Sequence, residues 1–107
     1  MKFKGYLLTF SFLWVEGMAL FPFIFSRTKK PGKVLLFHET IHLHQQLEMG
    51  LLLFYIWYFL EYLVRLIQYR NHHLAYLNIS FEREAYANEH EFEYLVNRKF
   101  WTFLRYL

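Results

Sequence analysis

The sequence predicts a mainly α-helical protein that forms a single domain, residues 1–107, with apolar helices that associate with a membrane. Three stretches, residues 34–49, 51–69 and 79–97, have the composition and residue spacing of helices. The apolar content is 56% and the aromatic content 23%, which is high for a soluble domain. A chain of 107 residues cannot bury all of these side chains, so we expect a membrane or a partner protein to cover some of them.

The composition also excludes several kinds of site. The chain has no Cys, so disulfides and thiolate metal ligands are absent. All nine acidic residues are Glu, so a carboxylate ligand must be a glutamate. The formal net charge of +3 is mild and the cations are spread along the chain, so nucleic-acid binding is not supported.

Residues 1–26 form an apolar segment that we expect to associate with the membrane. Gly5–Phe25 has the length of a membrane-spanning helix, but Glu16-Gly17 and Pro22 interrupt it. A signal peptide is less favoured because no convincing small-residue cleavage site follows. A third possibility is a helix to about Val15, followed by a short strand near residues 19–25 that Pro22 would confine to a sheet edge. Basic residues flank the segment: Lys2, Lys4, Arg27, Lys29, Lys30 and Lys33.

The predicted helix 34–49 follows a Pro31-Gly32 break and contains His38-Glu39-Thr40-Ile41-His42, an H-E-x-x-H motif. In a helix the two histidines leave the same face one turn apart, so both can bind one Zn²⁺. Glu39 would accept a proton from the water that the metal activates, and is the candidate catalytic base. His44 lies off this face and is not expected to be a ligand. The alternative is an ordinary helix with a polar, solvated face and no metal.

Residues 51–69 predict a second helix or a continuation of the first. The run Leu51–Leu60 is apolar on every face, which is typical of a helix buried in protein or lipid, but it is too short to span a membrane alone. Residues 70–78 contain the adjacent His72 and His73, which we expect in a solvated loop. The alternative is that one of them donates a hydrogen bond to an oxyanion. Residues 79–97 predict a third helix, capped by Asn78 or Ser80. The basic, aromatic tail 98–107 predicts a short amphipathic helix that lies on a membrane surface or packs on the core.

A catalytic zinc needs a third protein ligand. The HETIH motif and the downstream FEREAY segment resemble gluzincins, and among them the membrane-bound CAAX prenyl proteases and related bacterial peptidases. In that group the later helix carries E-x-x-A-D, and its Glu binds zinc. The resemblance covers the segment through Ala85, which implies that Glu82 is the third ligand. Tyr86 stands where the group has Asp, so a carboxylate that would orient a ligand histidine is missing.

The HETIHLHQQLE stretch is also similar to a family of short, uncharacterised bacterial zincin-like proteins. Reasoning from the residues alone also favours Glu82, because it opens an amphipathic helix whose small Ala85 allows close approach to the motif helix. Glu89 lies on the same face and is the alternative ligand, whereas Glu84 points elsewhere. We therefore expect a zincin-like helical core over residues 34–97, with metal ligands His38, His42 and Glu82.

These observations predict a membrane-associated zinc metallopeptidase. Its expected partners are membrane lipid and a peptide substrate, and a larger membrane protein complex is a further candidate. The resemblance implies a bacterial inner membrane. Two other functions remain open: a non-catalytic membrane subunit that retains a zincin-like core, and a membrane-lying helical protein without metal.

Overall fold

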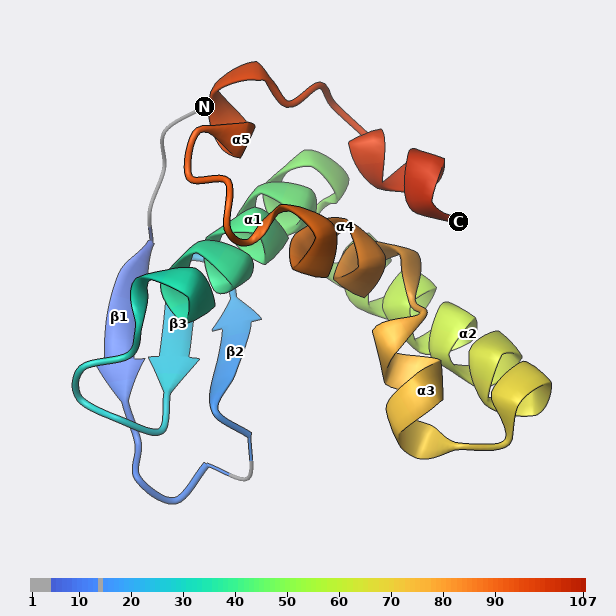
Figure 1. The fold of residues 1–107 in the computed structure, drawn as a ribbon, viewed down its shortest axis with the longest axis horizontal. Helices are drawn as coiled ribbons and strands as arrows, with labels where there is room; N and C mark the ends of the chain where they lie inside the picture. Colours follow the sequence, from blue (N-terminus) through green and yellow to red (C-terminus); the bar gives the residue numbers. More distant parts are fainter. Residues whose placement is uncertain (1–4, 14) are drawn as a thin grey trace.

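The computed structural model describes residues 5–13 and 15–107, and its described part is mainly α-helical with a small sheet (Figure 1). Helix α1 (Lys33–Met49), which carries the motif, lies between the other elements. The sheet packs beside one part of α1, and α4 (Ser80–Asn88) crosses close to it. Helix α2 (Leu51–Tyr69) and α3 (His72–Leu77) extend away from the sheet. The predicted fold class, mainly α with a short strand element, is confirmed.

The apolar N-terminal segment is a three-stranded sheet rather than a helix. It contains β1 (Tyr6–Thr9), β2 (Gly17–Leu20) and β3 (Phe23–Ser26), in the order β1-β3-β2. Strand β1 is parallel to β3, and β2 is antiparallel to it. The expected spanning helix and the expected helix to Val15 are therefore wrong for the described residues. The flanking Lys2 and Lys4 lie outside them.

Pro22 does not mark an edge strand. It lies in the two-residue turn between β2 and β3, so the expected strand near 19–25 is split into a hairpin. A turn tolerates Pro because no ladder hydrogen bond is required from its nitrogen. Strand β3 is then central, and its buried Ile24 packs with Ala19 and Leu43 between the sheet and α1.

Two predicted helix boundaries agree with the structure. Helix α1 ends at Met49, and Gly50 follows it with a φ of 81°, a conformation that side-chain-bearing residues rarely adopt. Helix α2 is therefore a separate helix and not a continuation of α1. Arg70, also in the left-handed region, ends α2 and donates its backbone N–H to Leu66.

Two other segments differ from the prediction. The expected loop 70–78 contains α3, because the Asn71 side chain caps a helix there by accepting a hydrogen bond from the Leu74 N–H at 2.9 Å. The expected helix 79–97 is two helices, α4 and α5 (Tyr94–Asn97). No side chain of Asn78 or Ser80 caps α4. Instead, the Glu61 carboxylate of α2 accepts the Ser80 N–H at 2.7 Å.

The C-terminal tail packs on the core. It forms a 3₁₀ helix, Thr102–Tyr106, instead of the expected amphipathic α-helix over 98–107. Its buried Phe103 contacts the rings of Phe81 and Trp57, at centroid distances of 4.4 and 5.2 Å. Phe54 of α2 completes this aromatic cluster, which holds α2, α4 and the tail together.

Candidate metal site

The two motif histidines lie on the buried face of α1. His38 and His42 are one helical turn apart, and their Nε2 atoms are 3.2 Å from each other. Both side chains are almost completely covered, at 3% and 5% exposure. The helical geometry assumed from the spacing is therefore present.

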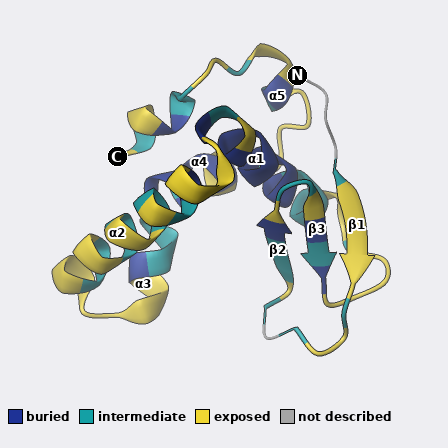
Figure 2. Ribbon diagram, turned by 180° about the vertical axis from the view of Figure 1, so that it is seen from behind, coloured by how far each residue is buried: buried dark blue, intermediate teal, exposed yellow. Residues whose placement is uncertain are grey.

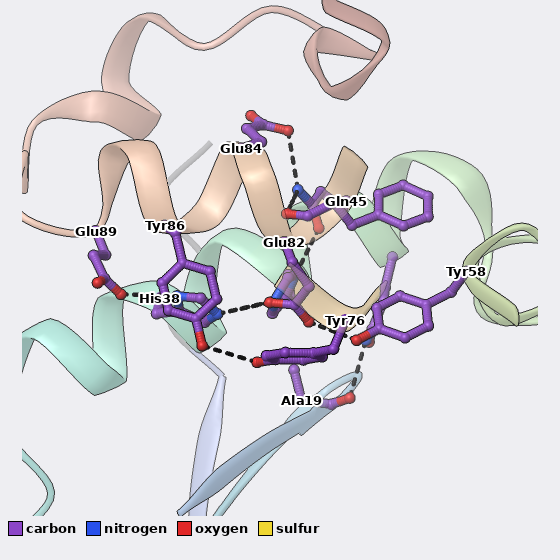
Figure 3. A network of polar contacts seen from close by, with 12 residues as sticks. Ala19, His38, Gln45, Tyr58, Tyr76, Glu82, Glu84, Tyr86 and Glu89 are labelled. Carbon is purple, nitrogen blue, oxygen red and sulfur yellow. Dashed lines mark hydrogen bonds and ion pairs between the residues drawn. The ribbon is translucent and has the colours of Figure 1, made fainter. Parts of the chain in front are cut away.

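Glu82 of α4 reaches the same point from the opposite side. Its Oε1 atom is 3.0 Å from Nε2 of His38 and 3.0 Å from Nε2 of His42 (Figure 3). A tetrahedral Zn²⁺ with bonds of about 2.0–2.1 Å separates its ligand atoms by roughly 3.3 Å, close to these distances. The three residues form a group that could hold a metal ion. The structure thus brings together all three residues that the sequence indicated as ligands.

Glu89, the alternative third ligand, lies beside the site but contacts Nδ1 of His38 and not the Nε2 atom at which the other residues meet. Its Oε2 accepts a hydrogen bond from Nδ1 of His38 at 2.9 Å, on the side of the ring that faces away from Glu82. This bond places the proton on Nδ1 and leaves the Nε2 lone pair for a metal. Glu89 therefore supplies the orienting carboxylate that Tyr86, in place of Asp, had put in doubt.

His42 is oriented in the same way by an amide. Its Nδ1 donates to Oε1 of Gln45 at 2.7 Å. The amide is in turn fixed because its Nε2 donates to Glu84 at 2.9 Å and to the Phe81 carbonyl at 3.2 Å. Glu84 points away from the three ligands, as expected. It accepts hydrogen bonds from Arg98 and Tyr94 as well.

The second oxygen of Glu82 is also held. Tyr58 of α2 donates its hydroxyl to Oε2 at 2.7 Å, so Oε1 alone faces the two histidines (Figure 3). Burial by itself would raise the pKa of Glu82, but His42 and His38 outweigh it and lower that pKa. Glu82 is therefore an anion, the form that a metal requires.

The same interaction changes His42. Burial would lower its pKa, but the Glu82 carboxylate outweighs this effect and raises the pKa to about 9. In the metal-free protein a proton is thus held where a metal would bind.

Glu39 lies next to the three ligands and makes a close approach to the sheet. It is 6% exposed, and burial raises its pKa even though His42 and His38 act in the opposite direction. A Cβ atom on Gly17 of β2 would lie 3.3 Å from Glu39 Oε2 and 3.0 Å from Leu35 Cδ1. A larger residue at position 17 would require Leu35 and Glu39 to shift.

Two tyrosines cover the site. The ring of Tyr86 is 4.4 Å from that of His38, and its hydroxyl is 3.0 Å from the hydroxyl of Tyr76 (Figure 3). Burial and the Glu82 carboxylate raise the pKa of Tyr76, so its hydroxyl stays protonated. The other histidines do not join the group: His44 is buried elsewhere on α1, and the exposed His72 lies 2.6 Å from the Tyr62 hydroxyl.

Several of these residues were not predicted. Gln45 was placed on the ligand face, and its position three residues after His42 was the available signal for its role. No local pattern marks Tyr58, Tyr76 or Gly17, because their contacts depend on how distant elements pack. No protein-family model, curated protein or solved structure matches the chain.

Proposed function

We propose that the protein is a membrane-associated zinc metallopeptidase, in which His38, His42 and Glu82 hold Zn²⁺ and Glu39 is the general base. The observation that carries the proposal is the convergence of three ligand atoms within 3.2 Å of one another, from two separate helices. Each ligand side chain is also held through its other polar atom, which is typical of metal sites.

Zinc fits this donor set better than calcium or magnesium. Two imidazole nitrogens and one carboxylate oxygen are typical zinc ligands, whereas calcium and magnesium prefer oxygen alone. Three protein ligands leave a fourth position open, as in catalytic zinc sites. A bound Zn²⁺ would supply Lewis-acid activation of water and of a carbonyl oxygen.

Glu39 is suited to move a proton because burial raises its pKa and so makes its carboxylate a stronger base. It would take the proton from the attacking water and pass it to the leaving amine. The Tyr76 and Tyr86 hydroxyls, which stay protonated, are candidate hydrogen-bond donors beside the reacting carbonyl.

The edge of β2 supports a peptide substrate. The Arg27 N–H bonds to the Glu16 carbonyl at 3.0 Å, so Glu16 and Arg27 form a hydrogen-bonded pair in the ladder. These pairs alternate along antiparallel strands, so Gly17 directs its backbone N–H and C=O away from β3. Gly17 lies near Glu39, and its outward backbone is where an extended peptide would add to the sheet. The added pairing would be short, because the next outward carbonyl, that of Ala19, already accepts hydrogen bonds from Gln46 and Tyr55.

A second candidate is a non-catalytic membrane subunit in which the metal only ties α1 to α4. The observation that favours it is burial, because His38, His42 and Glu82 are each at most 5% exposed. A structural site has no use for Glu39 as a base, so this residue distinguishes the two candidates.

Zinc content and peptide hydrolysis of four proteins test the proposal. The wild type, Glu39→Gln and His44→Ala should each bind one zinc, and His42→Ala should bind none. The zinc-loaded wild type should hydrolyse peptides and Glu39→Gln should not. If the His42 and His44 variants lose zinc equally, or the wild type binds none, the metal site is wrong. If the zinc-loaded wild type hydrolyses no peptide, the non-catalytic subunit is the better description.

A further inference from the structure

We propose that α2 lies in the plane of an anionic membrane, with its outer face in the lipid, and does not cross the bilayer. The outer face is defined by six exposed apolar residues of α2: Leu52, Ile56, Phe59, Leu60, Leu63 and Ile67. At about 100° per residue, these six fall within an arc of roughly 100° along the whole helix. The inference deepens the proposed membrane association and does not depend on metal binding.

Most of α2 is exposed (Figure 2), and its exposed side carries the apolar outer face. Its only charged residues, Glu61 and Arg65, fall on the side opposite the outer face. Glu61 accepts hydrogen bonds from the Ser80 N–H and from Nε1 of Trp57, both within 2.8 Å. Such an arrangement is the reverse of a soluble amphipathic helix and fits an apolar environment outside the protein.

The length and hydropathy of α2 would also suit a membrane span. The helix has 19 residues, which is about 28 Å, and the described chain contains one such candidate helix. However, Glu61 is near the middle of α2 and directly contacts Ser80, where α4 begins. A spanning α2 would therefore carry the start of α4, with Arg83, towards the centre of the bilayer, where charged groups are costly. An in-plane helix avoids this.

The charges around the outer face identify the partner as an anionic surface. The tail lies beside α2, because the Trp57 and Trp101 rings are 6.1 Å apart and Leu107 borders the groove along α2. In residues 50–80 and 99–107 the exposed charged residues are all cations: Arg70, Lys99 and Arg105. Glu61 has the one carboxylate side chain in these ranges, and it is already hydrogen-bonded. A second copy of the chain would bring these cations together, whereas anionic lipid would neutralise them.

Vesicle binding by the full chain tests the proposal. The probe is phosphatidylcholine vesicles with and without one quarter phosphatidylglycerol, in sedimentation assays with zinc or with a chelator. The test variant is Ile56→Gln/Leu60→Gln, at residues with 48% and 56% exposure. The matched control is Phe92→Gln/Val96→Gln, also four residues apart, with 48% and 55% exposure.

The wild type should bind the anionic vesicles more tightly than the neutral ones, and added salt should weaken this binding. The test variant should lose about tenfold or more in partitioning, and the control should lose little. The result should be the same with zinc and with chelator, so failure of metal binding would not be mistaken for failure of this inference. Absent vesicle binding, or equal losses in both variants, would overturn it.

Helix orientation is a separate readout. The chain has no native Cys, so single cysteines at Leu52, Leu60 and Ile67 can each carry an environment-sensitive fluorophore. All three labels should report one shallow depth on the same side of the bilayer. A deep label at Leu60 with the other two on opposite sides would show a spanning helix and overturn the inference. The inference would also be overturned if the wild type dimerised through α2 and did not bind vesicles.

Discussion

The two longest helices of the protein are opposite in composition and in burial. Helix α1 buries ten residues, and seven of them are polar, whereas α2 is strongly apolar and buries only Phe54 (Figure 2). Hydropathy alone would predict that α2 is buried and α1 is exposed. The comparison teaches that polar side chains can be buried where they find partners. It also teaches that hydropathy alone does not determine which helix of a small protein is buried.

The polar interior of α1 is held by a continuous set of interactions. From His42 it passes through Gln45 to Glu84, then to Arg98, and ends at Glu48. Arg98, at the start of the C-terminal tail, is a buried cation between two carboxylates, with 4% of its side chain exposed. The site is therefore tied to the C-terminal part of the chain.

The largest effect is predicted for a substitution that disrupts this polar interior. Arg98→Met should leave Glu48 and Glu84 buried without their cation and lower the free energy of unfolding by about 3–5 kcal/mol. Urea denaturation measures the loss. The exposed Arg105→Met is the control and should change stability by less than about 0.5 kcal/mol. A loss below about 1 kcal/mol for the Arg98 variant would mean that the network does not hold α1 in place.

A second prediction concerns pH. The raised pKa of His42, about 9, means that protons compete with zinc at a higher pH than for an ordinary histidine, near 6.5. Zinc affinity should fall by roughly tenfold per unit as pH is lowered below 9, in competition titrations with a chelator of known affinity.

The metal-free fold should show the opposite pH trend. Because the folded pKa of His42 exceeds the unfolded value, its stabilising contribution is complete below about 6.5 and is lost as pH rises through 9. The metal-free protein should thus be more stable at pH 6.5 than at pH 9. A zinc affinity that stays constant from pH 7 to 9 would contradict the raised pKa of His42.

A third prediction tests the close approach of the sheet to α1. Gly17→Ala should place a methyl group against Leu35 and Glu39 and cost about 1 kcal/mol of stability. If Glu39 is the base, peptide hydrolysis should fall by more than the stability change explains, while zinc content is kept. Gly32→Ala is the matched control, because no atom lies within 4 Å of its added methyl group.

The group of His38, His42 and Glu82, which could hold a metal ion, was predictable because its signals are local. His38 and His42 follow helical spacing, and Glu82 follows from the pattern of a later helix. Glu89 was expected on the same face as Glu82, and this was sufficient to bring it to the site, although as a partner of Nδ1 and not as a ligand. Glu82 and Glu89 are about two helical turns apart. Their spacing in the sequence does not determine which of them contacts Nε2 of His38 and which contacts Nδ1.

The N-terminal sheet was not predictable from the same reasoning. Its strands are short and rich in apolar residues on both faces, so length and hydropathy suggested a membrane segment. The deciding interactions are long-range: Gln46 of α1 accepts the Phe21 N–H at 2.7 Å and donates to the Ala19 carbonyl at 3.0 Å. Nothing near Ala19 or Phe21 in the sequence marks a partner 25 or more residues away.

The smallest predicted effect sharpens the contrast between α1 and α2. Ile67 is 77% exposed on α2, so Ile67→Gln should change stability by less than about 0.5 kcal/mol in lipid-free solution. Leu43→Ala, at a fully buried position of α1, should cost about 2–5 kcal/mol in the same denaturation assay. If Ile67→Gln instead destabilised the isolated protein strongly, α2 would be packed in solution against something other than lipid. Its apolar side would then belong to a protein interface.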